Sequence, residues 1–374
     1  PRHYGFKQVF GENGGPGSLF HALRNMGPMV AIARAMERHC PQALLLNFSN
    51  PEHKLCEAVT RLTAIRTYGL CHGVSGERAR LARLLEVPED DLETVACGIN
   101  HFCVFQVIRR RSTGEDLYPR LRALDRQGDP LAHWHELGLG RIILRRFGLW
   151  PAPGANHYGE YLRWATEFVA SELHFYYDPA DGPPWRTGRI PEFVYSMDHV
   201  RPDRPWRRRR ESRRGWMARM PLQPSGEFAV PIMEGVVTGR RRWIESVIVP
   251  NRGCIPNLQR DMAVEVPAWV DRRGVQPVRV APLPEALAAL MRLQGSIQQL
   301  LVEAFAERSR DKLLQAMLLE PTVDSYHNAV ACVDEMLALQ QRYLPRLTSA
   351  GSDAPTHYTG RVRATRRRSS RARR

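Results

Sequence analysis

Three stretches decide the fold: Asn47-Phe48-Ser49-Asn50-Pro51, Gly69-Leu70-Cys71-His72-Gly73 and Gly98-Ile99-Asn100-His101-Phe102. Each lies where a short apolar run, typical of a buried strand, ends and a loop begins. The three runs cover residues 43–47, 66–70 and 93–96. In open α/β sheets, ligands bind in the crevice beyond the carboxyl ends of the strands. We therefore expect the amides, thiol and imidazoles of these stretches to converge on one crevice.

Helical patterns alternate with these strands as far as residue 110, at 18–40, 52–64 and 75–85. Pro28 is expected to bend or break the first helix, and Ser75 to cap the third. Extended patterns follow at 96–97 and 102–109. Strand–helix alternation implies right-handed crossovers and a largely parallel sheet. The sequence thus predicts an α/β fold in which residues 1–110 form the second half of a doubly wound, Rossmann-like domain.

The pattern changes after residue 110 and predicts a mixed α/β, helix-rich catalytic and oligomerisation domain at 111–348. Helices are expected at 117–147, 158–173, 284–319 and 322–343, with paired strands between 236 and 249. Residues 178–220, rich in Pro, Arg and Trp, are expected to form a loop or insertion. Residues 349–374 are expected to be a basic, disordered tail.

The net charge of +15 is concentrated in two segments. Residues 201–214 hold eight Arg, one Asp and one Glu, a net of +6, and residues 361–374 hold eight Arg and no acid, a net of +8. These segments account for 14 of the 15 charges, so the remainder is nearly neutral. A role in nucleic-acid binding is therefore not expected, apart from non-specific, salt-dependent binding by the tail.

Length and cysteine usage restrict the class of protein. A chain of 374 residues can form one large or two medium domains with a substantial core. Its apolar runs are all shorter than the ~20 residues that span a bilayer, so no membrane association is expected. Seven scattered cysteines without a Cys-x-x-Cys pair favour a reducing cytoplasm over a disulfide framework.

Taken in order, Asn-x-[Ser/Thr]-Asn-Pro, Gly-x-Cys-His-Gly and Gly-[Leu/Ile]-Asn-His resemble the motifs of glycoside hydrolase family 4, the NAD- and divalent-metal-dependent glycosidases. Further similar segments lie at 11–17, 156–162, 224–227 and 264–268. The likeness is closest to the α-galactosidase-like branch, because His72 follows the Cys where the phosphoglycosidase branch usually has Asp. It implies a fold like that of lactate and malate dehydrogenases and a homodimer or homotetramer.

The glycine-rich turn that holds the NAD pyrophosphate in this family has no clear counterpart. No Gly-x-Gly-x-x-Gly follows a strand, and residues 11–17 follow only the short run 7–10. Because Pro1 aligns well inside the family pattern, we expect an N-terminally truncated chain.

Cys71 and His101 are the candidate metal ligands. Thiolate and imidazole suit a transition metal, although such residues are often a buried apolar thiol and a structural histidine. The resemblance implies that they hold Mn²⁺ or another divalent ion. His72 is then either a proton donor near the leaving group or an imidazole that orients Cys71.

Tyr161 matches the catalytic base of the family by its position in Asn156–Leu162. A phenol is a plausible base only if a metal or cation lowers its pKa, and the alternative is a tyrosine that anchors a helix. The resemblance places Asn50 between nicotinamide and substrate. Glu12 is expected to approach the same crevice and contact the cofactor, together with Asn13, or else both are solvated residues of a glycine-rich loop. Asn47 and Asn100 are expected to hold sugar hydroxyls, or else to cap turns.

The resemblance implies hydrolysis of an α-galactoside-like substrate by oxidation at C3, metal-assisted deprotonation at C2, elimination, addition of water and re-reduction. This chemistry lies outside the usual two-carboxylate scheme. Three alternatives remain: a metal-assisted NAD-dependent hydroxyacid dehydrogenase, which would accumulate NADH, an inactive remnant of the glycosidase, and a basic nucleic-acid-associated protein.

Overall fold

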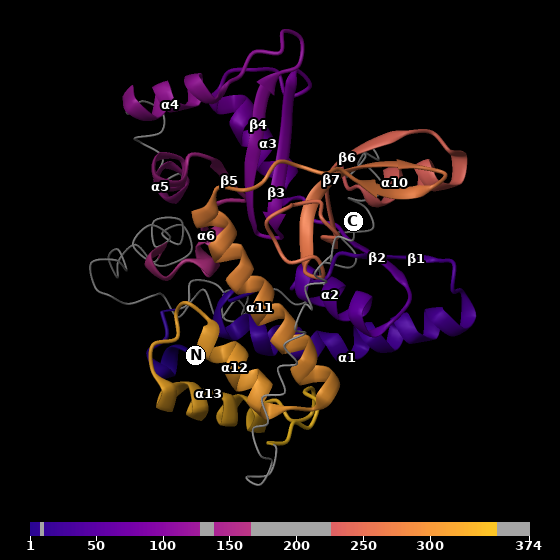
Figure 1. Ribbon diagram of the computed structural model, residues 1–374, viewed down its shortest axis with the longest axis vertical. Coiled ribbons are helices and arrows are strands. Elements are labelled where there is room, and N and C mark those ends of the chain that lie inside the picture. The colour runs from indigo at the N-terminus through magenta and orange to yellow at the C-terminus, as the bar shows by residue number, and fades with distance from the viewer. Residues whose placement is uncertain (8–10, 128–137, 166–225, 350–374) are drawn as a thin grey trace, which may run out of the picture.

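The computed structural model describes residues 1–7, 11–127, 138–165 and 226–349 (Figure 1). One eight-stranded sheet has the order β1-β2-β6-β7-β3-β4-β5, with β8 paired to β7. Its strands are β1 (Leu44–Asn47), β2 (Arg66–Gly69), β3 (Leu92–Ile99), β4 (Phe102–Arg110), β5 (Trp150–Ala152), β6 (Arg242–Pro250), β7 (Ala263–Asp271) and β8 (Gly274–Pro277).

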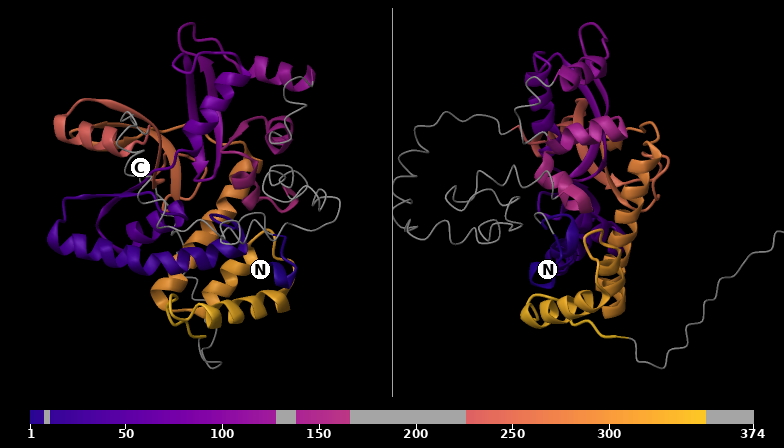
Figure 2. Two further views of the ribbon diagram at one scale, coloured as in Figure 1. Left: turned by 180° about the vertical axis from the view of Figure 1, so that it is seen from behind. Right: turned by 90° about the vertical axis from the view of Figure 1, so that its left-hand side faces the viewer.

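Helices surround this sheet and form a separate layer at one end. Figure 1 shows α1 and α2 beside β1 and β2, and Figure 2 shows the orange α11 running from the sheet to the yellow C-terminal helices. The α-helices are α1 (Gly15–His39), α2 (Glu52–Leu62), α3 (Gly73–Leu84), α4 (Tyr118–Gln127), α5 (Gly138–Phe147), α6 (Ala155–Tyr158), α10 (Ala229–Thr238), α11 (Glu285–Glu307), α12 (Arg310–Leu319) and α13 (Tyr326–Leu339). The short 3₁₀ helices are η1 (Arg2–Tyr4), η3 (Gly159–Tyr161) and η4 (Arg163–Ala165).

Parallel pairing among the described strands is restricted to β1 and β2, which α2 connects. The remaining pairs are antiparallel. The expectation of a largely parallel sheet is therefore wrong for this part of the chain. The reason is the connection between β3 and β4, where Ile99 pairs with Phe102 and only two residues form the turn. So short a connection can close an antiparallel hairpin but not a parallel crossover.

Helix α1 continues through Pro28, contrary to the expected bend or break. A residue before proline usually avoids the helical conformation because its Cβ meets the proline ring. Here that residue is Gly27, which has no Cβ, so the helix can pass. Helix α3 also begins earlier than expected, at Gly73, and the hydroxyl of Ser75 donates to the carbonyl of His72 at 3.0 Å instead of capping the helix.

Two further expectations are corrected between residues 155 and 250. Residues 155–165 form α6, η3 and η4 rather than one long helix, and 166–173 lie outside the described residues. Residues 229–238 form α10, which ends at the left-handed Gly239, so only the second of the two expected strands exists, as β6. The loop expected at 178–220 and nearly all of the expected tail lie outside the described residues.

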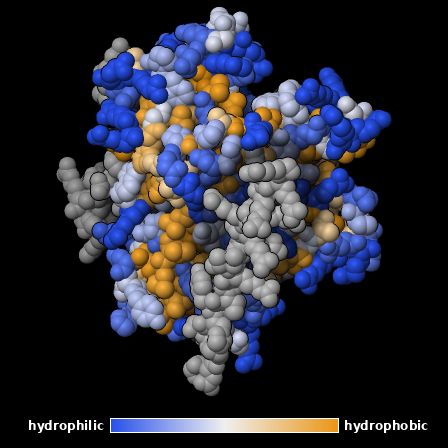
Figure 3. Space-filling view, viewed as in Figure 1, coloured by the Kyte–Doolittle hydropathy of each residue, from blue (hydrophilic) through white to orange (hydrophobic). Residues whose placement is uncertain are grey.

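Apolar side chains of α1, α2 and α11 form the core that orients the site. Leu19, Leu23, Leu55, Ile297 and Leu301 are fully buried in one cluster. Each such side chain contributes about 1.5–3 kcal/mol relative to exposure. This packing, with the hydrogen bond from Asn13 to Asn50, holds the N-terminus of α1 near the end of β1. Figure 3 shows apolar surface on the side where α11 and α12 lie.

The sheet contains strands from both sides of residue 110, because β6 pairs with β2 and β7 pairs with β3. The proposed divisions at 110/111 and 348/349 stay predictions. In the described ranges, no helix combines the length and apolarity that crossing a membrane requires.

Candidate active site

The loop before α1 is held by one carboxylate. The backbone N–H groups of Glu12, Asn13 and Gly14 donate to the two carboxylate oxygens of Glu160 at 2.8, 2.8 and 2.7 Å. Consecutive N–H groups at the start of a helix favour a negative charge. A Cβ at Gly14 would lie 2.8 Å from the Cβ of Glu160, so this approach needs glycine. Glu160 thus presents the side chains of Glu12 and Asn13 to the crevice.

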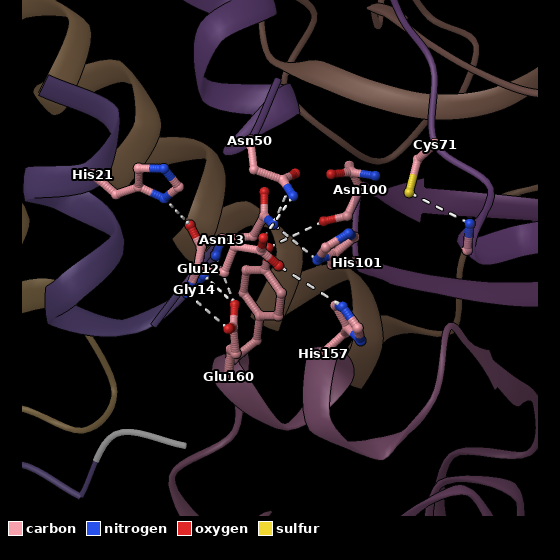
Figure 4. A network of polar contacts seen from close by, with 12 residues as sticks. Glu12, Asn13, Gly14, His21, Asn50, Cys71, Asn100, His101, His157 and Glu160 are labelled. Carbon is pink, nitrogen blue, oxygen red and sulfur yellow. Dashed lines mark hydrogen bonds and ion pairs between the residues drawn. The ribbon is translucent and has the colours of Figure 1, made fainter. Parts of the chain in front are cut away.

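Asn13 connects three segments that the sequence keeps apart. Its Nδ2 lies 2.9 Å from Nδ1 of His101 and donates to Oδ1 of Asn50 at 3.2 Å. Asn50 in turn donates from Nδ2 to Oε1 of Glu12 at 2.8 Å. Figure 4 shows these side chains pointing toward one another. The structure therefore brings Glu12, Asn50 and His101 together at the ends of α1, β1 and β3.

His101 occupies the second position of the β3–β4 turn and has a positive φ of 64°. Its ring is buried and meets the ring of His157 edge-on, with centroids 4.3 Å apart. Burial and the neighbouring His157 and His72 lower the pKa of His101 well below its ordinary value. A neutral imidazole keeps a lone pair that can bind a metal. Burial likewise lowers the pKa of His157 to about 4.

Cys71 lies just beyond β2 and is 8% exposed. Its Sγ accepts a hydrogen bond from the backbone N–H of Gly73 at 3.4 Å. Burial, then the carboxyls of Glu265 and Glu52, raise the pKa of the thiol. Only a bound cation or a similar positive group would convert this thiol to the thiolate that ligates metals.

Buried polar atoms without partners surround Cys71 and His101. Within the described part of the chain, they include Oδ1 of Asn13, Oδ1 of Asn100 and Oε2 of Glu52. Burial and the carboxyl of Glu265 raise the pKa of Glu52 to about 9. Buried polar groups are normally satisfied, so such a concentration indicates a polar group that binds here. Oxygen, imidazole and thiol donors fit a divalent cation together with a hydroxylated ligand.

Tyr161 reaches the same turn from η3. Its hydroxyl donates to the backbone carbonyl of Asn100 at 3.0 Å, and its ring stacks on Phe102 with centroids 4.8 Å apart. Burial, then the carboxyl of Glu160, raise the pKa of Tyr161 well above its ordinary value. The phenol can therefore act as a base only with a cation nearby.

His72 and Asn47 lie less centrally than expected. The His72 side chain is 83% exposed, and its Nδ1 lies 3.6 Å from a carboxylate oxygen of Glu227. Asn47 donates from Nδ2 to the carbonyl of Ser49 at 3.1 Å and accepts from its N–H at 3.0 Å. Its amide therefore shapes the loop that carries Asn50, and its role in sugar binding stays a prediction.

Several buried residues of the site were not identified as functional from the sequence. One of them is Glu265, which accepts from Asn100 at 3.1 Å and interrupts the apolar run of β7, a visible signal. Lys54 is fully buried and donates to the carbonyl of Asn13, and burial lowers its pKa to about 8. The charged run Glu52-His53-Lys54 gave no such signal, because it is typical of an exposed helix start.

Two family models and several known proteins match this chain. The family model described as "Family 4 glycosyl hydrolase" matches residues 1–87. The model described as "Family 4 glycosyl hydrolase C-terminal domain" matches residues 96–323. An alpha-glucosidase of Erwinia rhapontici is 29% identical, and an alpha-galactosidase of Bacillus subtilis (strain 168) is 28% identical. Each alignment covers 92% of this chain and 77% of the relative.

A solved structure has the same fold. It is a 6-phospho-alpha-glucosidase from gut microorganisms in complex with NAD and glucose-6-phosphate, with a TM-score of 0.67 and 25% identity over 92% of this chain and 79% of that one. The two family matches together extend over most of the chain and include the residues that build the crevice. The chain therefore belongs to glycoside hydrolase family 4.

Proposed function

We propose that this family 4 glycosidase hydrolyses an α-galactoside-like substrate through NAD-dependent oxidation at C3 and metal-assisted deprotonation at C2. The observation that carries the proposal is the meeting of Asn50, His101 and Tyr161 around the β3–β4 turn. Asn50 and His101 share Asn13 as a partner, and the Tyr161 hydroxyl contacts the residue before His101. Amide, imidazole and phenol at one place can bind a sugar, hold a cation and move a proton.

A divalent metal fits the donors of this chain. His101 and Cys71 would hold it, and the unpaired oxygens of Asn13, Asn100 and Glu52 lie in the same polar region. The donors include soft sulfur, borderline nitrogen and hard oxygen, which suits Mn²⁺ or a similar transition ion.

The nicotinamide end of NAD fits Asn50. Its amide both donates and accepts, which suits a carboxamide, and Glu12 fixes its orientation at 2.8 Å. The solved relative that contains NAD supports this cofactor. When bound, NAD supplies a hydride acceptor for C3 of the sugar, and the metal supplies Lewis-acid polarisation of the C2 and C3 oxygens.

Different side chains of this protein carry out the proton transfers and hold the substrate. Tyr161 removes the C2 proton, because it is the buried hydroxyl that contacts the metal-binding turn. Asn100 has an unpaired Oδ1 that can accept from a sugar hydroxyl. His72 is exposed at the start of α3 and donates a proton to the departing glycosidic oxygen. Asn47 supports Asn50 by closing its loop.

The substrate class follows from two features. Both curated relatives named above act on α-glycosides by name, one on glucosides and one on galactosides. A histidine follows the metal-binding Cys in this chain, as in the galactosidase-like branch. We therefore propose an unphosphorylated α-galactoside as the preferred substrate and an α-glucoside as the second candidate.

Hydrolysis of nitrophenyl α-galactoside, with and without NAD, Mn²⁺ and reductant, tests the proposal. Release of nitrophenol that requires both NAD and Mn²⁺, without net NADH, is the expected result. Net NADH from a hydroxyacid would instead identify a dehydrogenase. Absence of turnover on galactosides, glucosides and glucuronides alike would contradict the glycosidase.

A further inference from the structure

A carboxylate and two imidazoles meet at the mouth of the site. Ligand atoms of Glu12, His101 and His157 all lie within 4.8 Å of one another, the single such group of three in the part of the chain that the structure describes. Oε2 of Glu12 lies 3.8 Å from Nε2 of His157. The three residues come from the loop before α1, the β3–β4 turn and α6, and Figure 4 shows them facing one another.

We propose that Glu12 and His157 ligate the divalent metal together with His101. This inference rests on the proposed function and extends its metal site beyond Cys71 and His101. Two imidazoles and one carboxylate on one side of an ion leave the other positions open. Two adjacent oxygens of a sugar can occupy such positions, as Lewis-acid chemistry at neighbouring carbons requires.

Glu12 is already oriented by a second contact. Its Oε1 accepts from Nδ2 of Asn50 at 2.8 Å, which leaves Oε2 on the side of His157. Metal ligands are commonly held in this way, because a partner on the far atom fixes the direction of the near one. The carbonyl oxygen of the Asn13 side chain is fully buried and has no partner among the described residues. It is thus a second sign that a polar group belongs here.

The exposure of the three side chains suits the binding of a metal ion that must also contact substrate. His101 is buried, whereas the side chains of Glu12 and His157 are 28% and 31% exposed. An ion bound by these three side chains would therefore contact His101 on its buried side and solvent on the side of Glu12 and His157. Cys71 belongs to no described group of three ligand atoms, so Glu12 and His157 supply donors that the Cys–His pair lacks.

Mn²⁺ titration followed by electron paramagnetic resonance tests whether Glu12 and His157 ligate the ion, and it does not depend on measuring activity. The full chain is compared with Glu12→Gln, His157→Ala, His157→Gln and His101→Ala, and with His39→Ala, an exposed histidine at the end of α1, as the matched control. Circular dichroism checks that each variant folds, and His157→Gln preserves the size of the side chain if His157→Ala does not.

We expect the dissociation constant for Mn²⁺ to rise at least about tenfold in the Glu12 and His157 variants and to stay unchanged in His39→Ala. Unchanged binding in those variants, with binding lost in His101→Ala, would overturn the inference and leave the proposed function intact. Absence of Mn²⁺ binding in the parent chain would overturn both.

Discussion

The hydroxyl of Tyr161 donates to the backbone carbonyl of Asn100 at 3.0 Å, which ties η3 to the turn that carries His101. We expect Tyr161→Phe to reduce turnover about 10²–10⁴-fold, as is typical for loss of a proton-transfer group. The fold should persist, because the ring keeps its stacking on Phe102. Steady-state hydrolysis and thermal unfolding of the same preparation measure the two effects.

Tyr158→Phe is the matched control. Tyr158 is fully buried beside Phe102, and its hydroxyl has no partner among the described residues. Removing an unpaired hydroxyl should leave turnover unchanged and stability unchanged or increased. Equal loss of turnover in both variants would contradict the catalytic role of Tyr161.

The close approach of Gly14 to Glu160 predicts that a larger side chain at position 14 lowers the stability of the fold. In Gly14→Ala, the new Cβ lies 2.8 Å from the Cβ of Glu160, so we expect a loss of about 1–3 kcal/mol in the free energy of unfolding. Gly76→Ala, within α3, meets nothing within 4 Å and should gain about 0.5–1 kcal/mol. Urea unfolding of both variants measures these changes. A higher free energy of unfolding in Gly14→Ala than in the parent chain would contradict the steric contact.

Asp125 predicts a dependence of stability on pH. It is buried and accepts from Arg141 at 2.8 Å and Arg145 at 2.6 Å. Burial opposes its ionisation, but the two guanidinium groups outweigh burial and hold the pKa of Asp125 below its usual range. Its contribution is therefore complete above the pKa of the unfolded chain and disappears as pH falls through the lower, folded value.

Asp125→Asn should cost about 1–3 kcal/mol at neutral pH. The difference from the parent chain should shrink on acidification below about pH 4. Urea unfolding at a series of pH values measures this difference. A difference that grows in acid would show that the two arginines do not stabilise the ionised carboxylate.

Metal binding should also stabilise the fold. A ligand that binds only the native state at about one hundred times its dissociation constant adds about 2.7 kcal/mol. Addition of Mn²⁺ should therefore raise the melting temperature of the parent chain, and a chelator should reverse the change. The double variant Cys71→Ser, His101→Ala should show no increase. An equal increase in the double variant would place the ion elsewhere.

The sequence was sufficient to predict the α/β fold and the convergence of Asn50 with His101, because both stand just beyond an apolar run. The parallel sheet from which the convergence was expected is wrong, because β2 and β3 run in opposite directions. Their ends meet because Gly69 pairs with Ile248 and Gly98 with Glu265, which is itself the partner of Ile248. It did not predict the hairpin, since Asn100-His101 lacks the glycine that usually marks a two-residue turn. The interrupted helix after Tyr158 was missed because an apolar pattern does not reveal a change to 3₁₀ geometry. The burial of Lys54 depends on distant carboxyls such as Glu320, which no local pattern encodes.

The carboxylate of Glu160 accepts a hydrogen bond from the N–H of Gly14, the residue before α1, across 146 residues of sequence. During synthesis on the ribosome, the loop before α1 therefore emerges long before the carboxylate to which its N–H groups donate. Domains form as units once their distant contacts become available. A chain interrupted before residue 160 would consequently lack the carboxylate that holds Glu12 and Asn13 in the crevice.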